Sequence, residues 1–118
     1  MSSTLLLVLA AAAAVAAPPA VPVQREIAGL FAALDRSGCQ FRRNGRWYGA
    51  TRAHAHLQRK YDYLVAHARV PDAETFITLA ATRSSLSGRA YAVRCAGAAE
   101  VPSATWFRRE LARLRARP

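Results

Sequence analysis

The stretch CQFRRNGRWYG, residues 39–49, carries the strongest fold signal in the chain. Asn-Gly at its centre suits a two-residue β-hairpin turn, because both turn positions require a positive φ that these residues tolerate. Such a turn predicts the following cross-strand pairs: Arg43 with Arg46, Arg42 with Trp47, and Phe41 with Tyr48. We therefore expect an antiparallel hairpin here.

The two cysteines place a later strand beside this hairpin. Residues 89–95, RAYAVRC, have the composition of a strand. Alternation puts Cys39 on the face of Phe41 and Cys95 on the face of Val93. A Cys39–Cys95 disulfide fits two antiparallel neighbours, is expected in an oxidising compartment, and would stabilise the fold by about 4 kcal/mol in the chain-entropy model.

The opposite face of this sheet is basic and aromatic. It is predicted to carry Gln40, Arg42, Trp47, Ala92 and Arg94, with Arg43 and Arg46 near the hairpin tip. Arg42 opposite Trp47 predicts a cation–π pair. This face suits stacking on sugars or bases and contact with phosphates. The alternatives are that a helix covers it or that it is a solvated surface.

Four helices account for most of the remaining chain. Apolar periodicity predicts helices over residues 23–36 and 51–68, a shorter helix after Asp72, and a last helix after Ser103. Thr51, Asp72 and Ser103 are expected to cap their helices, and Ala68 to lie on a buried face. The predicted fold class is α+β: a small three-stranded antiparallel sheet, the hairpin plus one later strand, packed with about four helices.

The N-terminal region is predicted to be a targeting segment. Residues 5–17, LLLVLAAAAAVAA, are too few for a bilayer span of about 20 residues, and fit the apolar part of a secretory signal. Ala14 and Ala16 satisfy the A-x-A rule, which places cleavage after Ala16. The predicted organisation is a signal peptide (1–16), a Pro-rich tether (17–22) and a single α+β domain (23–118). The expected location is periplasmic or secreted without a transmembrane span in the mature chain; an N-terminal membrane anchor is the alternative.

The charge balance favours anionic partners. Seventeen basic residues against seven acidic ones give a formal net charge of +10. An anionic envelope polymer or lipid headgroup, or a protein partner, fits this balance; nucleic acid is possible but not favoured. The alternative is that the arginine excess is compositional and serves solubility.

Catalytic signals are weak. Ser84, Ser85 and Ser87 could serve a hydrolase with His56 or Lys60 as the base, but no spacing couples them, and the serines also suit turn hydrogen bonds. The histidines and acids show no metal-ligand spacing. We therefore expect no catalytic residue, metal or cofactor, and favour a protein that is not an enzyme.

One helical stripe is a candidate anion site. His56, Lys60, Tyr63 and His67 recur at helical spacing beside the apolar stripe of their helix. His56 and Lys60 could meet an anion together, although a solvated flank is the preferred interpretation.

At FRRNG, HLQRK and SSLSGRAYAV the chain resembles the YfeK-like family, small exported bacterial proteins grouped as a domain of unknown function. The resemblance implies a signal peptide and one exported domain, and brings no known activity. It singles out Arg43, His56, Lys60, Ser85, Ser87, Gly88 and Tyr91. The chain departs from the family at Arg52 and His54, where relatives tend to have acidic residues.

The leading functional prediction is an exported, non-enzymatic binding module, with the small hydrolase as the alternative. Lys60, His56 and the serine loop, residues 83–88, are expected to form one polar cluster if the second helix packs against this loop. The candidate binding residues are Arg42, Arg43, Arg46, Trp47, His56, Lys60, Ser85, Ser87, Tyr91 and Arg94.

Overall fold

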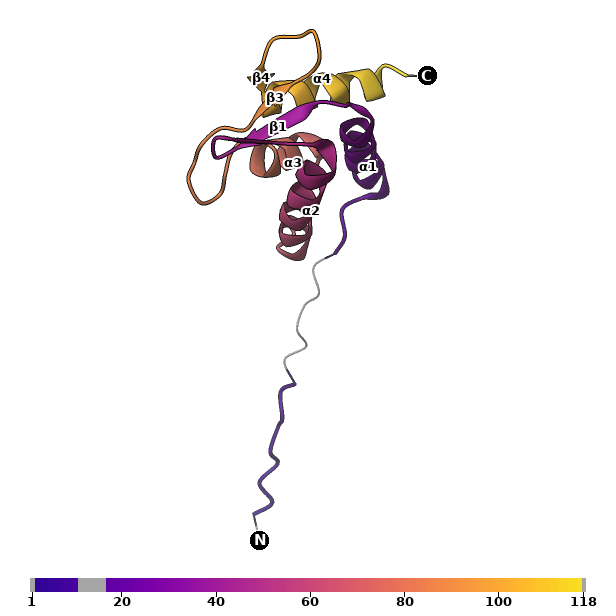
Figure 1. Ribbon diagram of the computed structural model, residues 1–118. Coiled ribbons are helices and arrows are strands. Elements are labelled where there is room, and N and C mark those ends of the chain that lie inside the picture. The colour runs from indigo at the N-terminus through magenta and orange to yellow at the C-terminus, as the bar shows by residue number, and fades with distance from the viewer. Residues whose placement is uncertain (1, 11–16, 118) are drawn as a thin grey trace.

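A computed structural model describes residues 2–10 and 17–117. The predicted cleavage point after Ala16 lies outside these residues. The elements, in chain order, are α1 Val21–Arg36, β1 Gln40–Arg43, β2 Arg46–Tyr48, α2 Ala50–Ala66, α3 Ala73–Ala80, β3 Ala92–Arg94, β4 Val101–Pro102 and α4 Ser103–Arg115 (Figure 1). The α+β class with four helices is confirmed. Among the described residues, no helix has the length and apolarity needed to cross a bilayer.

The hairpin has the predicted register. Arg43 pairs with Arg46, Arg42 with Trp47, and Phe41 with Tyr48. Asn44 and Gly45 form its turn with φ of 50° and 80°, the left-handed values that the turn requires. The Asn-Gly signal therefore identified both the hairpin and its pairing.

The sheet contains four antiparallel strands in the order β2-β1-β3-β4, so the expectation of three strands was wrong. The additional strand, β4, has two residues and pairs with β3 through Val93 and Val101. A segment this short has no alternation to recognise. Pro102 is accommodated because β4 lies at the edge of the sheet.

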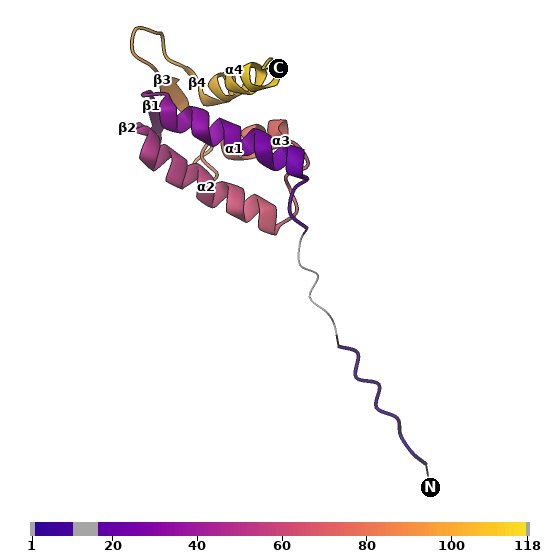
Figure 2. The ribbon, with the colours of Figure 1, turned by 90° about the vertical axis from the view of Figure 1, so that its right-hand side faces the viewer.

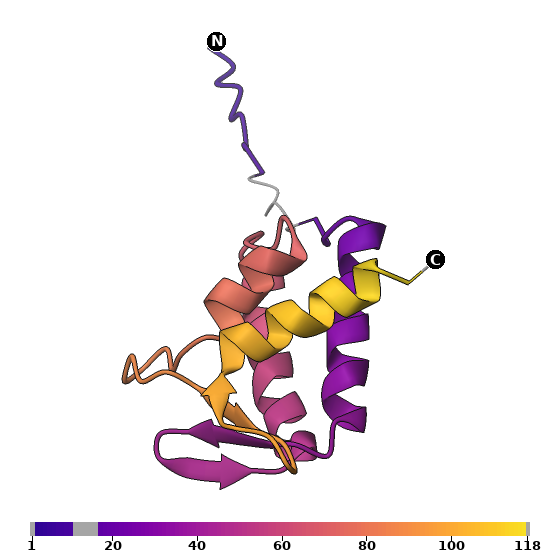
Figure 3. The same ribbon diagram turned by 90° about the horizontal axis from the view of Figure 1, so that it is seen from above.

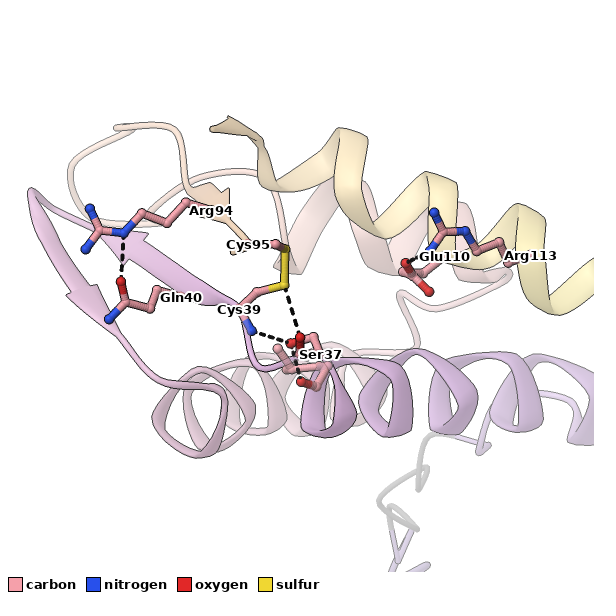
Figure 4. The surroundings of a disulfide bond; sticks show 8 residues. Ser37, Cys39, Gln40, Arg94, Cys95, Glu110 and Arg113 are labelled. Atoms are coloured by element: carbon pink, nitrogen blue, oxygen red, sulfur yellow. Dashed lines mark hydrogen bonds and ion pairs between the residues drawn. A yellow bond between two sulfur atoms is a disulfide. The ribbon is translucent and has the colours of Figure 1, made fainter. Parts of the chain in front are cut away.

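A disulfide joins Cys39 and Cys95 at the end of the β1–β3 ladder, as predicted (Figure 4). Its loop spans a sequence separation of 56 residues. The backbone N–H of Cys39 donates a hydrogen bond to the hydroxyl of Ser37, at 3.1 Å. The disulfide thus connects the segment that follows α1 to β3, a central strand of the sheet.

The helices gather on one side of the sheet and enclose the core. α1 and α2 run side by side (Figure 2), and α4 crosses α1 and α3 (Figure 3). Phe76 of α3, Phe107 of α4 and Val93 of β3 are fully buried where these elements meet. The sheet lies near the N-terminus of α2, so the hairpin lies beside the first turns of that helix.

Helix ends depart from the sequence prediction at several points. α1 begins at Val21 instead of residue 23, with Pro22 in its first turn, where proline is tolerated. Thr51 and Ser103 are not caps, because the helices already include them and begin after Gly49 and Pro102. The Asp72 cap is confirmed by its carboxylate accepting from the Thr75 N–H at 2.7 Å.

Ala68 was predicted to lie on a buried helix face, and this was wrong. α2 ends at Ala66, and Ala68 is exposed with a φ of 52°. The chain leaves the helical conformation at this residue, three positions before Pro71, which could not continue the helix.

Candidate functional site

A cleft of about 400 Å³ lies between the hairpin and the first half of α2. β2 ends at Tyr48 and α2 begins at Ala50, so the chain turns back directly beside its own hairpin (Figure 3). Four arginines line the cleft: Arg42, Arg43, Arg52 and Arg59. The local chain reversal thus concentrates arginines from a strand and a helix around one hollow.

No acidic residue lines this cleft in the part of the chain that the structure describes. The reason is visible in the sequence, since residues 36–61 and 75–99 contain neither aspartate nor glutamate. β1, β2 and the first half of α2 come from the first of these acid-free segments, and Tyr91 comes from the second. Folding brings the two segments together, so few acidic side chains lie near the arginines of the cleft. Glu100 pairs with Arg42 at 2.7 Å.

Four polar side chains are joined beside the cleft, and three of them, Arg43, His56 and Tyr91, line it. We call these three residues and Lys60 the polar cluster. Nη1 of Arg43 lies 2.8 Å from Nδ1 of His56, and Nε2 of His56 lies 2.9 Å from the Tyr91 hydroxyl. The Lys60 ammonium donates to the same hydroxyl at 3.3 Å and to the carbonyl of Arg83 at 2.9 Å. β1, α2 and the start of β3 therefore meet at this cluster.

The donors in the polar cluster fix the tautomer of His56. A guanidinium only donates, so Nδ1 of His56 must accept from Arg43. In the neutral imidazole, Nε2 then carries the proton and donates it to Tyr91. The Tyr91 oxygen thus accepts from both His56 and Lys60. Its own hydroxyl proton remains available for an acceptor in the cleft.

The environment keeps His56 neutral. Burial, followed by the charges of Arg43, Lys60 and Arg59, lowers the pKa of His56 from 6.5 to about 4. Burial and the charge of Arg43 also lower the pKa of Lys60 from 10.5 to about 8. The imidazole is therefore uncharged at pH 7, while the ammonium remains mostly protonated.

Burial also raises the pKa of the Tyr91 hydroxyl, and the charge of Arg43 opposes that effect. Tyr91 therefore keeps its proton at neutral pH. As a neutral phenol it can donate a hydrogen bond.

The ring of Tyr48 contacts two of the arginines that line the cleft. The guanidinium carbon of Arg43 lies 5.6 Å from the centroid of its ring, and that of Arg52 lies 5.7 Å away. Both arginines thus lie within cation–π range of one aromatic ring. Arg52 and Arg59 are exposed, so their charges face solvent at the entrance.

Ser103 lies in the floor of the cleft. It is the first residue of α4 and is only 3% exposed. Its backbone N–H donates to the carbonyl of Tyr91 at 3.0 Å, which holds the two residues together. Among the described residues, its hydroxyl has no hydrogen-bond partner, so a ligand can use it.

The serine loop packs against the hairpin turn and uses its hydroxyls for structure. Ser84 accepts from the N–H groups of Leu86 and Ser87, at 3.3 and 3.2 Å. Ser87 donates to the side-chain oxygen of Asn44 at 2.6 Å. Ser85 is exposed. Within the described residues, no serine of this loop bonds to His56 or Lys60; Lys60 contacts the loop only through the carbonyl of Arg83.

The outer face of the sheet is largely satisfied by its own contacts. The guanidinium carbons of Arg94 and Arg42 lie 4.0 and 5.2 Å from the centroid of the Trp47 ring. Arg94 also donates to the side chain of Gln40 at 2.7 Å (Figure 4). The predicted Arg42–Trp47 pair is confirmed. A stacking ligand would have to compete with these arginines for the ring.

The helical stripe His56, Lys60, Tyr63 and His67 does not form one site. His67 stacks on Tyr63, with ring centroids 4.1 Å apart, on an exposed part of α2. His56 and Lys60 instead turn toward Tyr91. The described residues contain no group of three or more His, Cys, Asp or Glu side chains arranged to hold a metal ion.

Sequence reasoning missed several residues of the cleft. Tyr48 and Ser103 were assigned structural positions only, and Arg59 was not considered. Arg52 was noted solely as a departure from the YfeK-like family. The available signal was the absence of acids from residues 36–61, which marks this part of the chain as unusually basic.

These features define a small α+β domain with a disulfide in its sheet and a basic cleft beside its hairpin. Residues 21–115, from the start of α1 to the end of α4, match a family model described as "Family of unknown function (DUF5329)". The chain belongs to this family, which confirms the prediction of an uncharacterised domain family. No curated protein and no solved structure is significantly similar to the chain.

Proposed function

We propose that this protein is an exported, non-enzymatic binding module that holds an anionic group of a cell-envelope component in the cleft between its hairpin and α2. One observation carries the proposal: the charged side chains that line the cleft are all arginines, and no acid lies among them in the described chain. Such a lining attracts anions and disfavours cations.

The proposed location has separate support. A disulfide between Cys39 and Cys95 is typical of oxidising compartments outside the cytosol. The apolar side chains of residues 5–9 are exposed, as expected of a segment that a secretion machinery or a membrane receives. We also propose that the chain shares the export of the YfeK-like proteins that it resembles, which would place it outside the cytosol.

Binding is favoured over hydrolysis by the hydrogen bonds of the candidate nucleophiles. Ser84 and Ser87 are engaged within their loop and with Asn44. A serine nucleophile needs a base within hydrogen-bond reach, and in the described chain neither His56 nor Lys60 bonds to these hydroxyls. His56 is instead oriented toward Tyr91, where it serves to position a donor.

The test is binding of the oxidised protein to anionic probes across a salt series. Suitable probes are pyrophosphate, a phosphorylated lipopolysaccharide core oligosaccharide and a single-stranded oligonucleotide. The double variant Arg52→Gln/Arg59→Gln removes two charges from the mouth. The double variant Arg69→Gln/Arg109→Gln removes the same charge from exposed positions outside the cleft and is the matched control.

We expect the affinity for at least one probe to fall with salt, and to fall by about tenfold more in the cleft variant than in the control. Equal losses in both variants would mean that net charge alone attracts anions, and would contradict the proposal. Turnover of ester substrates that is lost in Ser85→Ala would contradict the non-enzymatic assignment.

A further inference from the structure

The cleft has a closed floor and an open mouth, and the two ends differ chemically. Tyr91, Ser103 and Leu57 line it and are 6%, 3% and 5% exposed, respectively. Arg52 and Arg59 also line it and are exposed. A ligand that enters the cleft therefore contacts the guanidiniums at the mouth first, and the part of it that reaches the floor contacts neutral hydroxyls.

The floor offers two hydroxyl donors without protein acceptors. Tyr91 receives hydrogen bonds from His56 and Lys60, so its own proton has no acceptor among the described residues. The hydroxyl of Ser103 has no partner in the same part of the chain. The Tyr91 carbonyl accepts from the Ser103 N–H at 3.0 Å, which holds the two backbones side by side, and both residues line the cleft. No buried side-chain nitrogen or oxygen of the described residues lacks a partner, so the unbonded Ser103 hydroxyl is accessible from the cleft that it lines. Both hydroxyls can therefore donate to an acceptor in the cleft.

We propose that this floor is the subsite for a terminal phosphate group, so that the ligand is a phosphomonoester. One phosphate oxygen accepts from the Tyr91 hydroxyl and another accepts from Ser103, while Arg43 balances the charge. This inference rests on the proposed function and specifies the chemistry of the same cleft.

The closed floor requires a terminal group. A phosphodiester within a polymer continues on both sides of the phosphorus atom, and one side would have to leave through buried residues such as Leu57. A terminal phosphate has a single substituent, which can leave by the mouth, where the exposed Arg52 and Arg59 line the cleft. Polymers that lack terminal phosphates therefore reach only the entrance.

The donor inventory favours phosphate over carboxylate. Tyr91, Ser103 and Arg43 supply three donors, and a carboxylate would have to receive them on two oxygens that share a single negative charge. A phosphomonoester has three terminal oxygens and up to two negative charges, which suits several arginines at once. A volume of about 400 Å³ lies within the range of small-molecule sites and admits a group of sugar size behind the phosphate.

The phosphomonoester could belong to a soluble molecule or to a lipid, and the experiment separates these sources. Titration calorimetry of the oxidised protein uses glucose 6-phosphate as the soluble monoester and vesicles containing phosphatidic acid as the lipid monoester. Dimethyl phosphate supplies a diester, and glucuronate a carboxylate. The variants are Tyr91→Phe and Ser103→Ala, with Tyr63→Phe as the matched control on an exposed tyrosine.

We expect a monoester to bind at least about tenfold more tightly than the diester and the carboxylate, and Tyr91→Phe to weaken it by about tenfold. Ser103→Ala should have a similar effect, and Tyr63→Phe should have none. Thermal unfolding of each variant identifies any loss caused by misfolding, and Ser103→Ala provides the result if Tyr91→Phe is unstable. Selective binding of one monoester source identifies where the ligand comes from.

Two results would overturn the inference, and they differ in what they imply for the proposed function. Equal affinity for monoester, diester and carboxylate, unchanged in Tyr91→Phe and Ser103→Ala but reduced in Arg52→Gln/Arg59→Gln, removes the phosphate subsite and leaves anion binding in the cleft intact. Absence of binding to every probe removes both.

Discussion

Acidification from pH 7 to pH 5 should destabilise the fold through His56. Its pKa is lowered from 6.5 to about 4 in the folded protein by burial, Arg43, Lys60 and Arg59. Below pH 6.5 the unfolded chain therefore binds a proton that the folded chain does not, so stability falls as the pH falls from 6.5 toward 4. Above pH 6.5 this effect vanishes.

The magnitude follows from the two pKa values. Linkage between 6.5 and about 4 gives a loss of about 2 kcal/mol from pH 7 to pH 5 without screening. His56 is partly exposed, so solvent screening reduces the expected loss to about 1 kcal/mol. The carboxylates are common to every variant compared, so their contribution cancels in the comparison.

The assay is urea unfolding at both pH values, followed by tryptophan fluorescence. His56→Gln keeps a neutral polar group and removes the titration, so its stability should depend less on pH than that of the unmodified protein, by about 1 kcal/mol. His67→Gln, on the exposed end of the same helix, is the control and should retain the full pH dependence. Equal pH dependence in His56→Gln and the unmodified protein would refute the account of the polar cluster.

Three further variants test the fold by the same urea assay. Replacing both Cys39 and Cys95 by serine should cost about 4 kcal/mol because the closed loop is long; a loss below 1 kcal/mol would mean that the disulfide adds little constraint. Phe76→Ala empties a fully buried site and should cost about 3–5 kcal/mol, unless the core collapses around it. Asp72→Ala removes the α3 cap and should cost about 1 kcal/mol, whereas no loss would show that water replaces the cap.

Local chemistry explains why the sheet was predictable. The register of Phe41 with Tyr48 depends only on the positive φ values of Asn44 and Gly45, which the dipeptide itself favours. The disulfide adds one long-range restraint, and strand alternation then aligns β1 with β3. Strand β4 was missed because two residues before a helix carry no periodic signal. Its second residue, Pro102, also occupies the cap position that the sequence analysis assigned to Ser103, which is the first residue of α4.

The candidate site was only partly predictable, because it depends on how α2 packs against the hairpin. His56 and Lys60 were expected to share a cluster, and they meet at Tyr91. The role of the serine loop was different: it contributes the carbonyl of Arg83, and its hydroxyls stabilise the loop and the hairpin turn. Ser103 is distant in sequence from α2, so no pattern could place its hydroxyl in the cleft.

The most direct measurement of the central claim is a nitrogen-15 NMR titration of the oxidised protein with inorganic phosphate at low and high salt. Anion binding in the cleft predicts that the largest shift changes occur at Arg43, Tyr48, Arg52 and His56, and that they weaken as salt rises. Changes concentrated elsewhere, on the outer face around Trp47 or along the arginines of α4, would contradict the claim that the cleft is the binding site.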